Sequence, residues 1–169
     1  MYKICKTEKS IERQKLFQTT LISMMKKHKY QDITVTFLCK EMDIPRKTFY
    51  RYFDTLDDVL YAFIDDALTE AFLHLEVKTD MIGFFSYWKK NKALLDILEK
   101  SNLSAILVNR IYERAQVYAQ KGDVTNKQMR YSGYISAIMT VLLIWHHSGM
   151  KQSVEEMSQT ISLMFRMED

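Results

Sequence analysis

Glycine and proline are scarce in this sequence, which has four glycines and one proline among 169 residues. These residues end helices and shape tight turns, so a chain with few of them and many Lys, Leu, Met, Glu and Gln residues favours helix. No run alternates apolar and polar residues as a strand does. The expected fold class is therefore all-α.

Cysteine and long hydrophobic runs are also lacking. Cys5 and Cys39 lie far apart, without the spacing of a metal site or a disulfide framework, and free thiols suit a reducing cytoplasm. The longest apolar run, residues 137 to 145 interrupted by Thr140, is too short for a membrane span, which needs about 20 residues. No signal peptide is apparent. We expect a soluble, cytoplasmic protein that does not enter membranes.

Signals of metal binding and catalysis are missing too. His146 and His147 are adjacent, and neither has a Cys or a carboxylate four positions away, so they are predicted to end a helix rather than bind a metal. No Ser, Cys or carboxylate has the setting of a nucleophile, and no glycine-rich phosphate loop exists. We expect no metal, no cofactor and no enzymatic activity. An enzyme built on a helical bundle is kept as an alternative function, which a turnover assay would test.

Positive charge is concentrated at one end of the chain. Residues 1 to 52 hold 12 Lys and Arg against 5 Asp and Glu, a net charge of +7, whereas residues 53 to 169 hold 12 against 16, a net charge of −4. This asymmetry is expected when one end approaches a phosphate backbone. The first nine residues, with three lysines, are either a basic arm that nucleic acid orders or a frayed terminus.

The stretch from residue 34 to 53, TVTFLCKEMDIPRKTFYRYF, predicts two short helices joined by a turn. Asp43 tolerates a left-handed conformation and Pro45 disfavours helix at the residue before it, so the break falls at 43 to 45. Cys39 is predicted to pack between the helices. Phe49 and Phe53 are predicted to be structural, because their spacing directs both towards the preceding helices. The apolar positions of the stretch are Val35, Leu38, Met42, Ile44, Phe49 and Phe53.

Such a unit places its second helix in the major groove of double-stranded DNA. Lys47 and Thr48 are predicted to face base edges, and Tyr50 and Arg51 to face phosphates. A solvated helical hairpin is the alternative. The full set of predicted DNA-binding residues is Arg13, Thr34, Thr36, Arg46, Lys47, Thr48, Tyr50 and Arg51.

Three fragments, ITV at 33 to 35, LC at 38 to 39 and TFYRYF at 48 to 53, together resemble the DNA-binding domain of TetR/AcrR-family transcriptional regulators. The likeness covers roughly residues 10 to 62. Segments 84 to 100 and 131 to 165 are similar to the ligand and dimerisation region of such regulators from Gram-positive bacteria. Pro45 and Leu56 depart from the pattern, which has Ser and Lys there, and each departure removes a phosphate contact or a cap.

The resemblance implies a helix-turn-helix domain over residues 1 to 55 and a helical ligand-binding and dimerisation domain over residues 56 to 169. It implies a repressor that binds a near-palindromic operator as a homodimer and responds to a small apolar ligand. The alternative is a coactivator of the same fold, a protein-interaction module in which DNA binding is weak or absent. A mobility shift on DNA upstream of its own gene separates the two.

Helix boundaries follow from caps and apolar spacing. Ser10 is predicted to cap the first helix, and Thr34 to cap the second. Thr55 and Asp58 form a capping box for a long helix that continues to residue 75. The apolar stripe of the first helix is Leu16, Phe17, Thr20, Leu21, Met24 and Met25. Further helices are expected at 81 to 90, 92 to 100, 103 to 120, 125 to 148 and 152 to 167.

Two sets of apolar residues in the C-terminal part invite functional interpretations. One could line a ligand cavity or be ordinary core: Phe84, Phe85, Trp88, Leu94, Leu98, Ile106, Tyr112, Tyr134 and Met139. The other forms stripes on the last two helices, which could pair across a two-fold axis or close a monomeric core. The predicted interface residues are Ile138, Leu142, Trp145, Met157, Ile161, Met164 and Phe165.

Overall fold

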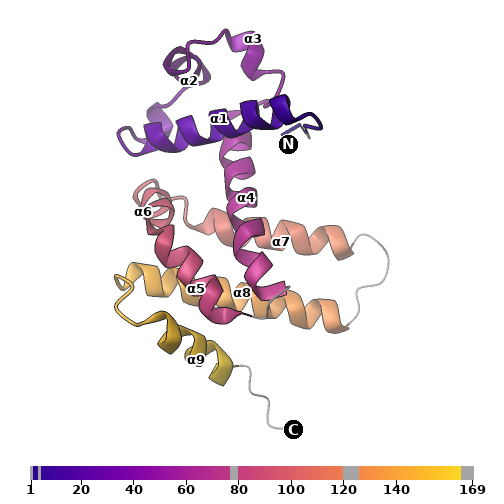
Figure 1. The fold of residues 1–169 in the computed structure, drawn as a ribbon, viewed down its shortest axis with the longest axis vertical. Helices are drawn as coiled ribbons and strands as arrows, with labels where there is room; N and C mark the ends of the chain where they lie inside the picture. The colour runs from indigo at the N-terminus through magenta and orange to yellow at the C-terminus, as the bar shows by residue number, and fades with distance from the viewer. Residues whose placement is uncertain (1, 4, 77–79, 120–125, 165–169) are drawn as a thin grey trace. The chain divides into compact units, whose positions relative to one another are not determined.

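The computed structural model describes residues 2–3, 5–76, 80–119 and 126–164, and all regular structure in these ranges is helical. This confirms the all-α fold class. Within the same ranges, no helix combines enough length and apolar character to span a bilayer. The elements in chain order (Figure 1) are α1 (Glu8–Met25), η1 (Tyr30–Asp32), α2 (Val35–Glu41), α3 (Arg46–Phe49), α4 (Leu56–Glu76), α5 (Met81–Lys90), α6 (Lys92–Lys100), α7 (Ala105–Ala119), α8 (Asn126–His147) and α9 (Val154–Met164).

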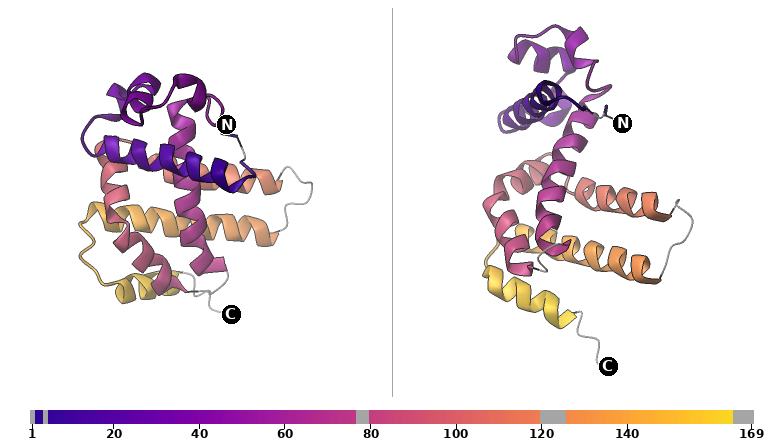
Figure 2. Two further views of the ribbon diagram at one scale, coloured as in Figure 1. Left: turned by 45° about the horizontal axis from the view of Figure 1, so that its top comes forward. Right: turned by 45° about the vertical axis from the view of Figure 1, so that its right-hand side comes forward.

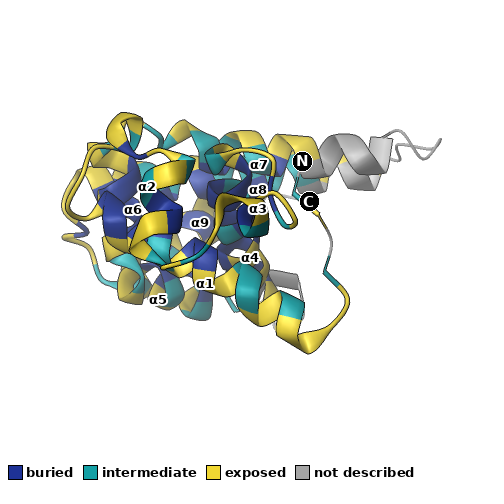
Figure 3. Cartoon of the chain, turned by 90° about the horizontal axis from the view of Figure 1, so that it is seen from above, coloured by how far each residue is buried: buried dark blue, intermediate teal, exposed yellow. Residues whose placement is uncertain are grey.

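The chain divides into two compact units, residues 1–68 and 69–169. Unit 1 contains α1 to α3 and the first part of α4, and unit 2 contains the rest of α4 and all later helices. Buried and exposed positions alternate around the helices in Figure 3, as expected for amphipathic helices. The division at residues 55 and 56 stays a prediction about function.

The first turn of α1 differs from the prediction. The helix begins at Glu8 with Thr7 as its N-cap, and the Thr7 N–H donates a hydrogen bond to Ser10 Oγ at 3.2 Å. Ser10 is therefore the third helical residue, which closes a capping box from inside the helix, and not the cap itself. Thr and Ser are both common N-cap residues, and Thr7 and Ser10 both precede the apolar stripe. The sequence alone therefore does not decide which of them caps the helix.

The buried side of α1 also differs from the predicted stripe. Leu16 is 47% exposed, whereas Gln18 and Ile22 are buried together with Phe17 and Leu21. The core-facing stripe is thus turned by about one residue. Leu16 fits the predicted stripe only because it is apolar, and single apolar residues on a surface are common.

The other predicted caps of unit 1 are confirmed. The Phe37 N–H donates to the Thr34 hydroxyl at 3.1 Å, which starts α2. At the start of α4, the Thr55 N–H donates to Asp58 Oδ2 at 3.0 Å and the Asp58 N–H donates back to Thr55 Oγ1 at 3.2 Å. Cys39 is 2% exposed, and burial raises the pKa of its thiol, so it packs as predicted.

Unit 2 is a helical bundle around an aromatic centre. Helices α7 and α8 run side by side and α9 packs on α5, as Figures 1 and 2 also show. Phe84, Phe85 and Trp88 of α5 have no exposed surface, and the Phe85 ring meets Trp145 of α8 edge-on with centroids 5.6 Å apart. The predicted helices of this unit are confirmed to within a few residues, and residues 165–167 of the last one lie outside the described ranges.

Candidate nucleic-acid interface

The turn between α2 and α3 has the predicted chemistry. Asp43 adopts a left-handed conformation with φ of 51°, and the Ile44 N–H donates to the Cys39 carbonyl at 3.0 Å. Pro45 follows as the N-cap of α3, with φ of −66° and ψ of 142°. Pro45 is therefore extended, not helical, and its ring fixes φ at the residue from which α3 starts.

Helix α3, the second of the two short helices predicted in this stretch, is a single turn of four residues. Only residues 46–49 are helical, and the chain continues through residues 50–52 as a turn, so we refer to residues 46–53 as the recognition turn. Two of its own backbone hydrogen bonds, from the Tyr50 N–H to the Arg46 carbonyl and from the Arg51 N–H to the Thr48 carbonyl, are long at 3.3 Å. A single turn with such bonds depends on its surroundings for its shape.

The recognition turn is anchored by its aromatic underside. Phe49 and Phe53 are both 0% exposed, and their ring centroids lie 5.5 and 5.8 Å from that of Phe17 on α1, nearly at right angles to it. Edge-to-face contacts of this kind stabilise beyond the burial of apolar area. The structural role predicted for both residues is therefore confirmed.

On the exposed side of the turn, Arg46 and Tyr50 contact each other. The guanidinium carbon lies 5.9 Å from the centroid of the Tyr50 ring, and an Arg46 N–H donates to the Tyr50 hydroxyl at 3.3 Å. Tyr50 is 42% exposed. The ring thus restricts the orientation of the guanidinium, in addition to offering its own hydroxyl to a ligand.

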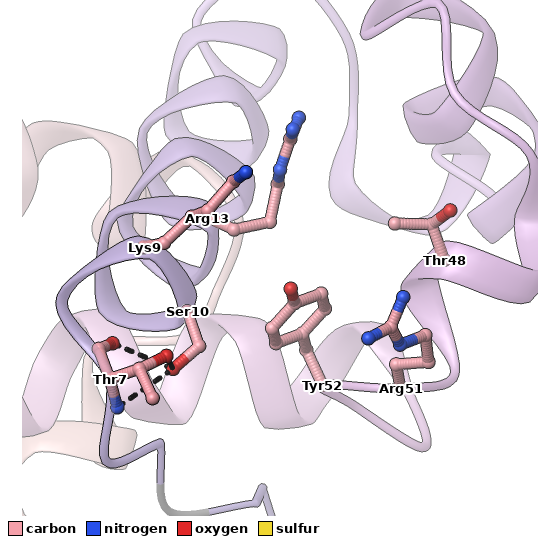
Figure 4. A pocket seen from close by; sticks show the side chains of 7 residues that line it. All are labelled: Thr7, Lys9, Ser10, Arg13, Thr48, Arg51 and Tyr52. Atoms are coloured by element: carbon pink, nitrogen blue, oxygen red, sulfur yellow. Dashed lines mark hydrogen bonds between the residues drawn. The ribbon is translucent and has the colours of Figure 1, made fainter.

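A groove of about 510 Å³ lies between the start of α1 and the recognition turn. Figure 4 shows Lys9 and Arg13 on one wall, and Arg51, Thr48 and Tyr52 on the opposite wall. In the part of the chain that the structure describes, none of the three cations has a carboxylate partner. Three unpaired cations surrounded by hydroxyl groups form a site for an anion such as a phosphate.

The groove unites only some of the predicted DNA-binding residues. Arg13, Thr48 and Arg51 line it, whereas Lys47 is exposed outside it and Thr34 and Thr36 are exposed at the start of α2. Thr48, predicted to face a base edge, therefore shares the groove with Arg51, which was predicted to face a phosphate.

Four lining residues were not among the predicted DNA-binding residues: Thr7, Lys9, Ser10 and Tyr52, of which Lys9 was predicted only as part of a basic arm or a frayed terminus. A signal for one of them is present, because Lys9 precedes Arg13 by four positions and residues so spaced share a helix face. The others give no such signal. Ser10 was explained by its predicted capping role, and no spacing relates Thr7 or Tyr52 to Arg13.

The predicted ligand-pocket residues of unit 2 fall into two groups. Phe84, Trp88, Leu98 and Met139 are 0% exposed, whereas Tyr112 is 63% exposed and so does not line an enclosed cavity. Ile106 and Tyr134 are half-buried, and burial raises the pKa of the Tyr134 hydroxyl. Within the described residues, the Trp88 indole N–H is a buried donor without an acceptor.

The stripes predicted as a dimer interface are covered within one chain. Ile138, Leu142, Trp145, Met157 and Ile161 are at most 6% exposed, which makes them core of unit 2. Such side chains offer no surface to a second copy. Met164 is 53% exposed, and Phe165 lies outside the described residues. Other exposed apolar side chains on the same two helices are Met129, Ile144 and Leu163, at 57%, 64% and 59%.

The two C-terminal histidines of α8 bind carboxylates of α6, which the sequence did not predict. His146 is 5% exposed, with Nε2 2.8 Å from Asp96 Oδ1 and Nδ1 3.3 Å from Glu99 Oε2. His147 Nδ1 lies 2.6 Å from Glu99 Oε1. The partners are 47 to 50 positions apart in the chain, so no local spacing could reveal them. No group of three or more candidate ligands in the described ranges is arranged to hold a metal.

This cluster predicts an acid-sensitive unit 2. Hydrogen bonds from Lys92 and His146 hold the pKa of Asp96 below its usual range, and hydrogen bonding to His147 does the same for Glu99. Carboxylates with a lowered pKa stabilise the fold above their unfolded pKa, about 4, and lose this contribution as pH falls through the folded value. We expect Asp96→Asn to flatten the fall in unfolding free energy between about pH 5 and pH 3 by less than about 1 kcal/mol, since the pair is half-exposed.

Urea titrations at several pH values measure this effect. The control is Asp32→Asn, which neutralises an exposed carboxylate in the other unit. An equal acid dependence in wild type and Asp96→Asn would contradict the assignment.

A helix-turn-helix unit with a cationic groove, followed by a helical bundle, is the arrangement of a helix-turn-helix transcriptional regulator. The family described as "Transcriptional regulator C-terminal region", a TetR family, matches residues 76–167, which is more than half of the chain. The chain belongs to the TetR family of transcriptional regulators.

The fold is also that of a solved regulator. The structure named "Dihydroxyacetone kinase operon activator DhaS" matches with a TM-score of 0.58 and 16% sequence identity, over 89% of this chain and 92% of that chain. At this identity the likeness concerns the fold alone. No curated protein matches the sequence.

Proposed function

We propose that this protein is a sequence-specific DNA-binding repressor that acts as a homodimer in the cytoplasm and responds to a small apolar ligand. Residues 1–55 would bind a near-palindromic operator, and residues 56–169 would bind the ligand and the second subunit. The observation that supports DNA binding best is the groove in which Lys9, Arg13 and Arg51 converge without carboxylate partners among the described residues. A phosphate of the DNA backbone supplies the missing negative charge.

In this proposal the recognition turn enters the major groove. Arg46 and Lys47 are exposed at its start, where they can reach the acceptor atoms of guanine, and Arg46 is oriented by the Tyr50 ring. The groove beside α1 holds the flanking phosphate, which fixes the register of the turn on the duplex. In this proposal Arg46 and Lys47 read the bases, whereas the residues of the groove position the protein on the DNA backbone.

The test of this function begins with selection of binding sites from a random pool of DNA duplexes. We expect Lys47→Ala to relax the base preference at one position and to weaken binding to the preferred site by about 1 to 3 kcal/mol. Tyr50→Phe should weaken binding to preferred and non-preferred sites by similar factors. An unchanged preference in Lys47→Ala would show that Lys47 does not read a base, and absence of any selected site would contradict DNA binding.

The homodimer is supported by apolar side chains that the single chain leaves exposed on α8 and α9, which are Met129, Ile144, Leu163 and Met164. A pair of subunits related by a two-fold axis would cover them and set two recognition turns about 34 to 36 Å apart, one helical turn of DNA. We expect a dimer in sedimentation at micromolar concentration, and a monomer after Ile144→Asp. The control, Ile82→Asp, alters an apolar residue of α5 that is 45% exposed. A monomeric wild type would contradict the dimer.

Ligand response is supported by the buried Trp88 N–H, which has no acceptor among the described residues. A buried donor without a partner destabilises the fold, and a ligand with one acceptor group in an otherwise apolar body would relieve this. Native mass spectrometry of the purified protein tests for such a ligand, and Trp88→Phe should reduce its retention.

The coactivator alternative keeps some support from two positions. Pro45 caps α3 without any side-chain hydrogen bond, and Leu56 at the start of α4 is half-buried, so neither offers a group to a phosphate. The structural neighbour is itself named an activator. A protein that shifts no DNA upstream of its own gene would favour this alternative.

A further inference from the structure

The N-terminal strap, residues 2–3, joins three parts of unit 1. The Tyr2 hydroxyl donates to Asp65 Oδ2 on α4 at 2.7 Å, and Gln14 Nε2 on α1 donates to the Lys3 carbonyl at 2.7 Å. Asp65 is 7% exposed. The strap is therefore fixed at both residues by groups that belong to long helices.

The same strap reaches the end of the recognition turn. Lys3 Nζ donates to the Tyr50 carbonyl at 2.6 Å, and the Lys3 N–H donates to the Tyr52 carbonyl at 3.2 Å. Lys3 Nζ also lies 3.8 Å from Asp54 Oδ1. The last carbonyls of a helix lack partners inside the helix, and a cation there favours the negative end of the dipole.

We propose that Lys3 is a positioning residue for DNA recognition, which holds the C-terminal end of the recognition turn and does not bind a phosphate itself. The recognition turn has only one helical turn and two long internal hydrogen bonds, so its shape depends on its surroundings. Phe49 and Phe53 fix its underside, and Lys3 fixes its carbonyl end. This inference rests on the proposed DNA binding for its functional half.

The competing role for Lys3 is that of a basic arm that binds DNA. The two roles differ in salt dependence, because removing a cation from a phosphate lowers the slope of log K against log salt concentration by about 0.9. Removing a positioning group leaves that slope nearly unchanged and loosens the turn instead.

The experiment compares Lys3→Met with wild type in two measurements on the full chain. We expect hydrogen exchange of the backbone amides of residues 50–53 to become roughly three- to tenfold faster, and affinity for selected duplex DNA to fall by a similar factor at an unchanged salt slope. Lys3→Arg should restore both. Lys6→Met removes a neighbouring exposed lysine and should leave the exchange rates as in wild type.

Tyr2→Phe gives a second measurement without any change of charge. It removes the strap's bond to Asp65, and it should speed exchange at residues 50–53 in the same direction as Lys3→Met. A salt slope lowered by about 0.9 in Lys3→Met with unchanged exchange would overturn the proposal, and so would wild-type exchange and affinity in that variant. If the wild-type chain binds no DNA, the proposed function fails, whereas the exchange rates still decide whether Lys3 holds the turn.

Discussion

Phe49→Ala is expected to lower the free energy of unfolding by about 3 to 5 kcal/mol, the usual cost of removing a fully buried phenyl ring. Phe49 is 0% exposed and touches Phe17, Phe53 and Tyr50 with centroids 5.3 to 5.9 Å apart. Because small domains have only about 5 to 15 kcal/mol of stability, much of the variant should be unfolded or easily unfolded. Urea denaturation followed by circular dichroism measures the decrease.

The matched comparison is Tyr50→Ala, which removes an aromatic ring of the next residue. Tyr50 is 42% exposed, so its truncation should change stability by less than about 1 kcal/mol while weakening DNA binding. The pair therefore separates unfolding from impaired binding by a folded protein. A Phe49→Ala protein as stable as wild type would mean that the recognition turn is rotated about its axis.

Replacement of all three groove cations, Lys9, Arg13 and Arg51, by Met is expected to reduce DNA affinity at least about hundredfold at low salt, since each charge-assisted hydrogen bond contributes about 1.5 to 3 kcal/mol. The salt slope should fall by about 0.9 for each phosphate that is no longer neutralised. Methionine keeps the apolar stems that pack on the surface, so stability should be nearly unchanged. Fluorescence anisotropy across a series of salt concentrations measures both quantities.

The control replaces Lys26, Lys27 and Lys29, exposed lysines at the other end of α1, by Met. It removes the same charge from unit 1 without touching the groove. If affinity and slope fall equally in both triple variants, the groove is no special site and unit 1 attracts DNA by net charge alone.

Local sequence signals predicted the local structure well. Thr34, Asp43 and the pair Thr55 and Asp58 were identified from chemistry that acts within four residues, and each forms the expected cap or turn. The aromatic anchors followed from spacing alone, because positions four apart in TFYRYF must share a face.

Features that join distant segments were not predictable. Lys3 and Tyr50 are 47 positions apart, and His146 and Asp96 are 50 apart, so no periodicity relates them. The shortness of α3 was not predicted, because residue spacing does not reveal where the backbone hydrogen bonds of a helix lengthen. Most of the residues predicted at a dimer interface are core of unit 2, because an apolar stripe indicates burial but does not say against which surface.

Under the proposed function, the residues that anchor the recognition turn are not the residues that read DNA. Phe49 and Phe53 are buried beneath the turn, whereas Arg46 and Lys47 are exposed on it. Substitutions at such exposed positions usually change stability by no more than about 0.5 kcal/mol. If these side chains read DNA as proposed, single substitutions at Arg46 or Lys47 would change the preferred operator during evolution while each variant stays folded.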